Sequence, residues 1–138
     1  MRTSRIPPTS ATPERGFPVL YGLFVALCLS IFGMMAVIWL AQADDMTDGR
    51  IVVGSYIVHG LATFVGAFVA SRRAKHREGW YVGGITGLLY SCVMTAIGFV
   101  SFQTFTLDAD GMFRILLMTI LASFAGVLGK ASTREPAK

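Results

Sequence analysis

Four long apolar stretches, separated by short polar segments, form the main pattern of this chain. No charged residue occurs from Pro18 to Ala43 or from Ile51 to Ser71. An apolar run of about 18 residues or more is long enough to cross a hydrocarbon core of about 30 Å as an α-helix. The pattern therefore predicts an all-α integral membrane protein with spans at about 19–41, 51–70, 80–102 and 112–129.

The two ends of the chain differ in composition from the apolar stretches. Residues 1–16 contain Pro7, Pro8 and Pro13 among serine, threonine and arginine residues, which is typical of a disordered segment. Residues 131–138 form a short tail that carries basic residues. A chain of 138 residues suits a single domain, so we expect one transmembrane domain at 17–130 between two tails.

Small residues recur at every fourth position of the predicted helices, which places them on one stripe of each helix. Where side chains are small, two helix backbones can approach closely in lipid, where packing drives helix association. We therefore expect these stripes to meet at the centre of a four-helix bundle. The helix-packing residues predicted in this way are Gly22, Ala26, Ser30, Ala62, Gly66, Ala70, Gly83, Gly87, Ser91, Ala122 and Gly126.

An internal repeat relates the two halves of the chain. The first and third predicted helices match at an offset of 65 residues, where Gly22-Leu23 corresponds to Gly87-Leu88. The second and fourth match at an offset of 60, where Leu61–Gly66 corresponds to Leu121–Gly126. The repeat predicts two tandem helical hairpins that both enter the membrane from the same side. The alternative is a chance match among helices that are all rich in glycine and alanine.

The composition supports the membrane assignment and indicates an orientation. Hydrophobic residues make up 54% of the chain, charged residues 14%, and the mean hydropathy is +0.61; a soluble domain is about one quarter charged. Ten of the twelve basic residues fall in the two tails and in the turn between the second and third spans. By the positive-inside rule, both termini are expected in the cytoplasm. This topology explains the net charge of +4, so we expect no nucleic-acid partner.

The turn between the second and third predicted helices is strongly basic. Its charged residues are Arg72, Arg73, Lys75 and Arg77. Their effect on topology suffices to explain their presence. A cytoplasmic basic cluster can also bind anionic lipid head groups, with a gain of about 1 kcal/mol per base near such a surface, and the two roles are compatible.

His59 is the candidate functional residue within the spans. It lies about halfway along the second predicted helix, on the same face as Ala62 and Gly66. Ionisable residues inside a membrane often act as proton relays or ligand contacts. The simpler alternative, which we favour, is a neutral imidazole that is hydrogen-bonded across the bundle to a serine, threonine or tyrosine. We expect no aspartate, glutamate, lysine or arginine to accompany His59 in the spans.

The sequence contains no pattern that predicts catalysis, a metal site or a cofactor. His59 and His76 lie at different levels of the predicted bundle, whereas a metal site needs several ligands at suitable spacing. Cys28 and Cys92 are isolated within apolar runs, where we expect them to be small buried hydrophobic residues. Nucleophile elbows and phosphate-binding loops are absent from the sequence.

Several glycine-rich motifs resemble those of a known family. The stretch Gly66–Ala74, followed by Gly79-Trp80 and Gly87–Tyr90, and the early Tyr21–Leu23 are similar to the YrzE-like family of small four-span bacterial membrane proteins. The resemblance covers about residues 17–130. It implies a four-span fold in a bacterial plasma membrane, and it implies no activity.

Two functions remain open. The preferred one is a non-enzymatic membrane protein that binds lipids, other membrane proteins or itself, as an accessory or assembly factor. The alternative is a small transporter or channel subunit that uses His59 and that oligomerises, because four short helices enclose little lumen. A polar, water-accessible cavity at His59 is the feature that distinguishes the two: a dry centre there favours the first, and solute flux that His59→Ala abolishes favours the second.

Overall fold

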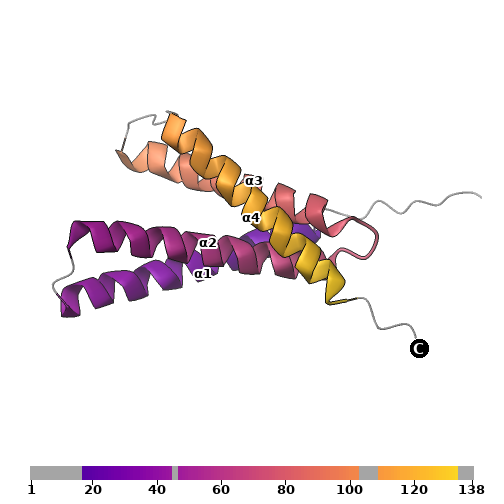
Figure 1. Cartoon of the computed structure of the whole chain (residues 1–138), viewed down its shortest axis with the longest axis horizontal. Coiled ribbons are helices and arrows are strands. Elements are labelled where there is room, and N and C mark those ends of the chain that lie inside the picture. Colours follow the sequence, from indigo (N-terminus) through magenta and orange to yellow (C-terminus); the bar gives the residue numbers. More distant parts are fainter. Residues whose placement is uncertain (1–16, 45–46, 103–108, 134–138) are drawn as a thin grey trace, which may run out of the picture.

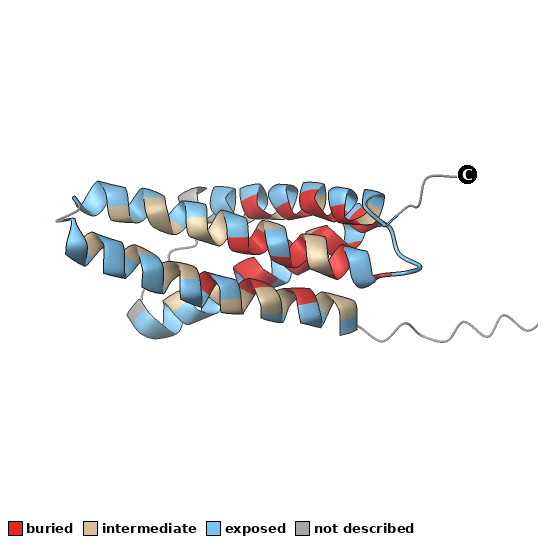
Figure 2. Ribbon diagram, turned by 90° about the horizontal axis from the view of Figure 1, so that it is seen from below, coloured by how far each residue is buried: buried red, intermediate tan, exposed pale blue. Residues whose placement is uncertain are grey.

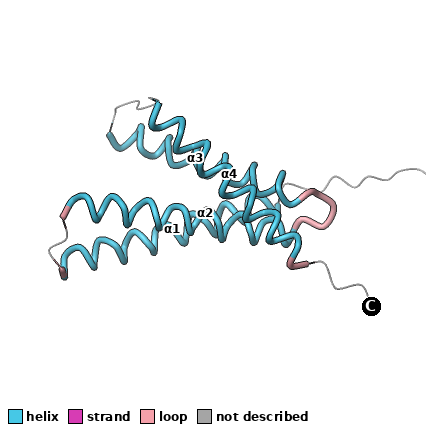
Figure 3. The backbone as a smooth tube through the Cα atoms, viewed as in Figure 1, coloured by secondary structure: helices cyan, strands magenta, loops and turns pink. Residues whose placement is uncertain are grey.

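The computed structural model describes residues 17–44, 47–102 and 109–133. These residues form four helices and contain no strand (Figure 1; Figure 3). All four helices occur where the apolar pattern predicts them, with ends within three residues of the predicted bounds. The predicted tail at 1–16 and residues 134–138 of the second tail lie outside the described part of the chain. The helices are α1 (Phe17–Ala43), α2 (Asp48–Arg73), α3 (Gly79–Phe102) and α4 (Ala109–Ala131).

Each helix is long and apolar enough to cross a membrane. A helix satisfies its backbone hydrogen bonds internally, as the hydrocarbon core requires. Large apolar side chains such as Phe32, Trp39 and Val100 are exposed on the outer surface, where they contact the lipid bilayer. The chain is therefore an all-α integral membrane protein. Its candidate spans are Phe17–Ala43, Asp48–Arg73, Gly79–Ser101 and Gly111–Ala131.

The helices form two antiparallel hairpins, α1–α2 and α3–α4 (Figure 1). Helices α2 and α3 each contact the other three helices, so they form the centre of the bundle, with α1 and α4 on either side. The two tandem hairpins predicted from the repeat are thus confirmed.

Burial is confined to one half of the bundle, which we call the packed end (Figure 2). This half surrounds the turn at residues 74–78 and contains every buried residue that the structure describes. In the other half, the open end, no described residue of 31–61 or 92–117 is buried. The two hairpins diverge toward the open end, as Figure 1 shows. The bundle is therefore splayed at one end, beyond the stripes of small residues.

All eleven predicted helix-packing residues are buried at the packed end. Each stripe contacts chiefly the stripe of its hairpin partner. A Cβ atom added at Gly22 would lie 2.5 Å from Gly66 O and 2.5 Å from Ala70 Cβ. In the second hairpin, a Cβ added at Gly83 would lie 2.8 Å from Gly126 Cα. Real Cβ atoms do not come so close, so the backbones of each pair touch directly.

The two hairpins make equivalent contacts, but the residues that are equivalent in the structure are only partly those that the sequence repeat pairs. Gly22 packs on Gly66 O and residue 70, and Gly79 packs in the same way on Gly126 O and Lys130. The second and fourth helices therefore correspond at an offset of 60, as predicted. The first and third correspond at 57 rather than 65, which is two helical turns away.

Polar contacts hold the chain around the 74–78 turn. The Ser71 hydroxyl donates a hydrogen bond of 3.1 Å to Gly79 O, which joins α2 to the start of α3. The Lys130 ammonium at the end of α4 donates to Ala74 O and, at 3.0 Å, to Lys75 O. Both carbonyls directly follow α2, so the ammonium places a positive charge beside the C-terminus of that helix, which is favourable.

Replacing Gly126 with alanine should lower the stability of the bundle. Its Cβ would overlap with Gly79 O and lie 2.9 Å from Gly83 Cα, so α3 and α4 would have to separate. The matched control is Gly98→Ala, because a Cβ at Gly98 has no atom within 4 Å. Alanine is also a better helix former than glycine by about 1 kcal/mol. We expect G126A to lower the melting temperature in detergent and G98A to leave it unchanged or raise it; equal melting temperatures would contradict this account.

Candidate functional site

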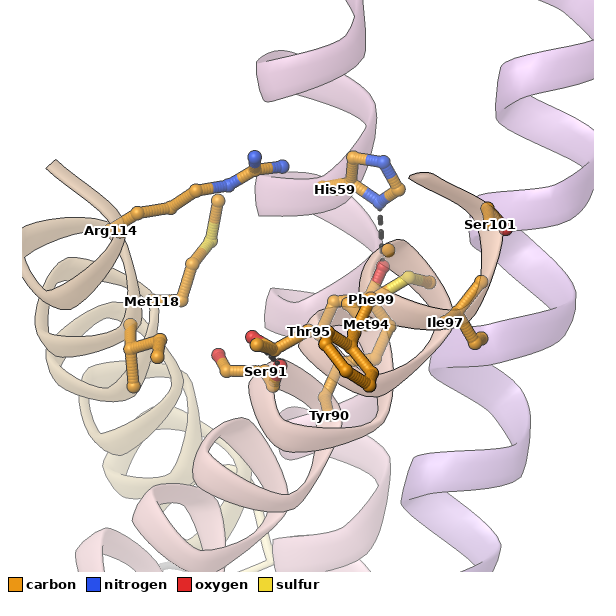
Figure 4. Close-up of a pocket in the computed structure, with 13 residues that line it drawn as sticks. His59, Tyr90, Ser91, Met94, Thr95, Ile97, Phe99, Ser101, Arg114 and Met118 are labelled. Carbon is orange, nitrogen blue, oxygen red and sulfur yellow. Dashed lines mark hydrogen bonds between the residues drawn. The ribbon is translucent and has the colours of Figure 1, made fainter. Parts of the chain in front are cut away.

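A cavity of about 380 Å³ lies at the open end, where the hairpins diverge (Figure 4). Helices α2, α3 and α4 line it with both polar and apolar side chains. One of the polar side chains is His59, the candidate functional residue that the sequence predicted. The side chains that matter for its chemistry are His59, Tyr90, Ser91, Thr95, Arg114 and Met118.

His59 and Tyr90 form a hydrogen bond across the two hairpins. Nδ1 of His59 on α2 lies 2.7 Å from the hydroxyl oxygen of Tyr90 on α3. Tyr90 is the largest fully buried side chain of the described residues, so its hydroxyl needs a partner inside the bundle. This contact is of the kind expected for a histidine that is bonded across the bundle. It joins α2 of one hairpin to α3 of the other, and both residues line the cavity.

Most hydroxyl groups near the cavity are bonded to a carbonyl of their own helix. Thr63 donates to His59 O at 2.7 Å, and Thr95 donates to Ser91 O at 2.8 Å. Such bonds to the carbonyl one turn earlier satisfy a hydroxyl that would otherwise be buried without a partner. These groups hold the polar wall in place and are not available to a ligand at low cost.

Ser91 is the exception to this pattern. Its side chain is 94% buried, since only 6% of the residue is exposed, and its Oγ has no hydrogen-bond partner. The side chain lies at the cavity and points from α3 toward α4 (Figure 4). A buried polar group without a partner is rare and costs about 1–3 kcal/mol. Ser91, predicted as a helix-packing residue, is therefore also an unfilled polar position of the cavity.

Arg114 places a positive charge in the same cavity, and the expectation that no charged residue accompanies His59 was wrong. Arg114 lies on α4, and its guanidinium points toward the His59 ring (Figure 4). The guanidinium carbon is 4.7 Å from the centroid of the Tyr56 ring, a cation–π contact. The sequence held a signal for this residue, because position 114 falls within the span predicted at 112–129.

The depth of Arg114 explains how a charge is tolerated there. Arg114 is the sixth residue of α4, so its Cα lies about 8 Å from the start of the helix at 1.5 Å per residue. A helix of 23 residues is about 35 Å long and exceeds the hydrocarbon core by a few ångströms. At this depth the guanidinium faces the polar cavity and the Tyr56 ring, the kind of surroundings in which a charged side chain of a span is tolerated.

The basic turn lies at the opposite end of the bundle from the cavity. Arg72, Arg73, Lys75 and Arg77 are all exposed. Arg73 packs over Tyr21 of α1, with 3.6 Å between the guanidinium carbon and the ring centroid. Part of this cluster therefore also contacts the bundle itself.

The remaining candidate ligands are scattered. Cys28 and Cys92 are free thiols, and Cys92 is exposed, so its predicted burial was wrong. In the described ranges, no group of three or more histidine, cysteine, aspartate or glutamate residues is placed to hold a metal ion.

Comparisons with known proteins agree on a membrane protein family. The profile of a family described as "Protein of unknown function (DUF3792)" matches residues 15–129. The chain is also similar to the uncharacterized membrane protein YrzE of Bacillus subtilis (strain 168), with 26% identity over 98 residues. This alignment covers 70% of the chain and 65% of that relative, which is slightly less than two thirds of its length. No solved structure matches the chain. These similarities confirm the resemblance to the YrzE-like family.

Two buried serines should respond in opposite ways to replacement by alanine. Ser71→Ala removes the donor to Gly79 O and should lower the free energy of unfolding by about 1 kcal/mol. Ser91→Ala removes a hydroxyl without a partner, so stability should stay the same or rise. Thermal unfolding of both variants in the same detergent measures the difference. A loss in S91A as large as that in S71A would show that Ser91 supports the fold.

Proposed function

We propose that this chain, which belongs to the DUF3792 family, is a non-enzymatic accessory or assembly factor that binds lipids or other membrane proteins through its open end. Residues 17–130 would act as one transmembrane domain. The binding surface would consist of the cavity and of the apolar helix faces beside it.

The observation that carries this proposal is the contrast between the two ends of the bundle. At the packed end, backbone contacts at Gly22, Gly66 and Gly126 leave no room for a ligand. At the open end, the hairpins diverge around a cavity of about 380 Å³, a volume typical of sites for small ligands. The groups around it that could bind a polar ligand are the Arg114 guanidinium and the unpartnered Ser91 hydroxyl. Binding is therefore the role that this arrangement supports best.

A second candidate function is a small oligomeric transporter or channel subunit that uses His59. The polar cavity at His59 favours it, because transport needs such a cavity, whereas a binding role does not require one. The packed end opposes it, because the touching helices block a path through a single chain, so a pore would have to form between chains. Solute uptake into proteoliposomes that His59→Ala abolishes would support transport and would count against a pure binding role.

We propose an orientation from the distribution of charge. The basic turn, with exposed Arg72, Arg73, Lys75 and Arg77, would face the cytoplasm together with both termini, in a bacterial plasma membrane. The turn would then lie close to anionic lipid head groups of the inner leaflet. The cavity would open toward the outer leaflet.

A reporter fused after Lys138 should be cytoplasmic. The reason is that an even number of spans returns the chain to the side where the first tail begins, and most basic residues lie on that side. Fluorescent-protein and phosphatase fusions, which are active on opposite sides of the membrane, measure this directly. An active phosphatase at Lys138 would reverse the orientation.

Photo-crosslinking in native membranes should detect a binding partner at the open end only. A photoreactive residue at Val100, which is 77% exposed on α3, should capture a lipid or a heterologous membrane protein. The matched control is Phe124, which is 69% exposed on α4 at the packed end. Discrete products from position 100 and only diffuse lipid labelling from position 124 are expected. The same products from both positions, or none from position 100, would contradict binding through the open end.

A further inference from the structure

We propose that the cavity binds the phosphate group of an anionic phospholipid, with Arg114 as its cation and Ser91 as a buried donor. This inference rests on the proposed binding function and names its ligand. It is carried by the grouping of a guanidinium, an unpartnered hydroxyl and a histidine–tyrosine pair in one cavity.

Arg114 supplies the charge that an anion requires. No residue among those described around the cavity carries a carboxylate, so the cavity as described is positive. The guanidinium packs on the face of the Tyr56 ring, and this contact uses none of its N–H donors. These donors therefore remain free to bond to phosphate oxygens. Arginine binds phosphate oxygens through charge-assisted hydrogen bonds that are stronger than neutral ones.

Ser91 points independently to a ligand. Its hydroxyl is buried at the cavity wall and has no partner, whereas the hydroxyls of Thr63 and Thr95 nearby are bonded to carbonyls. A phosphate oxygen is an acceptor of the kind that this hydroxyl lacks. The contacts of α3 with α4 place Ser91 close to the level of Arg114, because Gly87, one turn earlier on α3, packs against Met118, one turn later on α4. One anion can therefore meet both residues.

The histidine–tyrosine pair adds a third polar group. When the Tyr90 hydroxyl donates to Nδ1 of His59, the ring proton of the neutral imidazole is on Nε2. His59 is then a neutral donor at the cavity, which suits an anion without requiring a second buried charge.

The surroundings favour a lipid over a soluble phosphate. Met94, Ile97, Ile115 and Met118 give the cavity an apolar wall, and the hairpins on either side expose apolar faces to the acyl chains. Arg114 lies about 8 Å from the start of α4, on the side of the cavity from which a lipid head group would enter. A phospholipid can thus place its head group in the cavity while its chains lie along the diverging helices.

Lipid binding to the full chain in a neutral detergent tests the proposal. Native mass spectrometry would measure the apparent Kd for phosphatidylglycerol, for phosphatidylcholine and for inorganic phosphate. We expect phosphatidylglycerol to bind most tightly and Arg114→Gln to weaken it at least about tenfold, as the loss of a charge-assisted hydrogen bond implies. Arg50→Gln is the matched control, because Arg50 is an exposed arginine of α2 that does not line the cavity; it should leave the Kd unchanged.

Two further variants keep the result interpretable. Ser91→Ala should weaken phosphatidylglycerol binding about threefold or more while its melting temperature stays the same or rises, so a loss of folding cannot explain the effect. Arg72→Gln probes the basic turn, where an anionic lipid can also bind. If R72Q weakens binding and R114Q does not, the lipid binds at the turn and the proposal fails. Inorganic phosphate that binds as tightly as the lipid would also overturn it, in favour of a soluble anion.

The failure of this inference is distinguishable from that of the proposed function. A protein or lipid captured at Val100 together with phosphatidylglycerol affinity unchanged in R114Q would leave the binding role intact and remove the phosphate site. Binding of phosphatidylglycerol that depends on Arg114 without any capture at Val100 would support the site and reject the broader apolar surface.

Discussion

Direct contact between helix backbones at the glycines of the packed end is the constraint on which the rest of this structure depends. Lipid chains are as apolar as the helix surfaces, so the hydrophobic effect does not hold transmembrane helices together. Short-range dispersion does, and it requires close approach over many atoms. Gly22 and Gly66 permit that approach within the first hairpin, and Gly79 and Gly126 permit it within the second. Gly129 lies against the backbone of Phe68 and joins the two hairpins at the same end.

The open end follows from where this contact stops. The first hairpin remains closed along its length, because Gly33 packs on Val58 and Gly54 on Val37. The separation therefore arises between the hairpins, beyond the point where Ala67, Ala122 and Ala125 bring α2 and α4 together. Polar groups exposed in such a gap need partners, and the His59–Tyr90 hydrogen bond forms at the fork itself. The position of the cavity is thus a consequence of the distribution of small residues along the helices, and its polar lining marks the place where packing alone no longer joins the hairpins.

The sequence predicted the helices, the hairpins and the buried stripes, because each of these depends on a local period of hydrophobic or small residues. It did not predict the pairing of α3 with α4, which makes Gly79 rather than Gly87 the counterpart of Gly22. Small residues at every fourth position offer nearly equivalent pairings one or two turns apart, and contacts such as that of Lys130 on α4 with Ala74 O and Lys75 O, which exist only in the fold, favour one of them. The site was only partly predictable, because its side chains come together only in the folded bundle. His59 stands out within a span, but Ser91 looks like one more member of a stripe, and Arg114, although it falls within the span predicted at 112–129, lies so near its start that the sequence does not place it beside His59.

The asymmetry between the two ends also bears on how occupancy of the cavity would affect the protein. A ligand shifts a conformational equilibrium only through a difference in its affinity for the alternative states. Here the groups that face the cavity come from both hairpins, with His59 on one and Ser91 and Arg114 on the other. An anion that contacts both would favour one separation of the hairpins over others. The packed end resists a change of distance because its backbones already touch, so any adjustment must occur by a change in the angle between the hairpins. The glycine contacts would then act as the pivot, and the geometry of the open end would depend on what fills it.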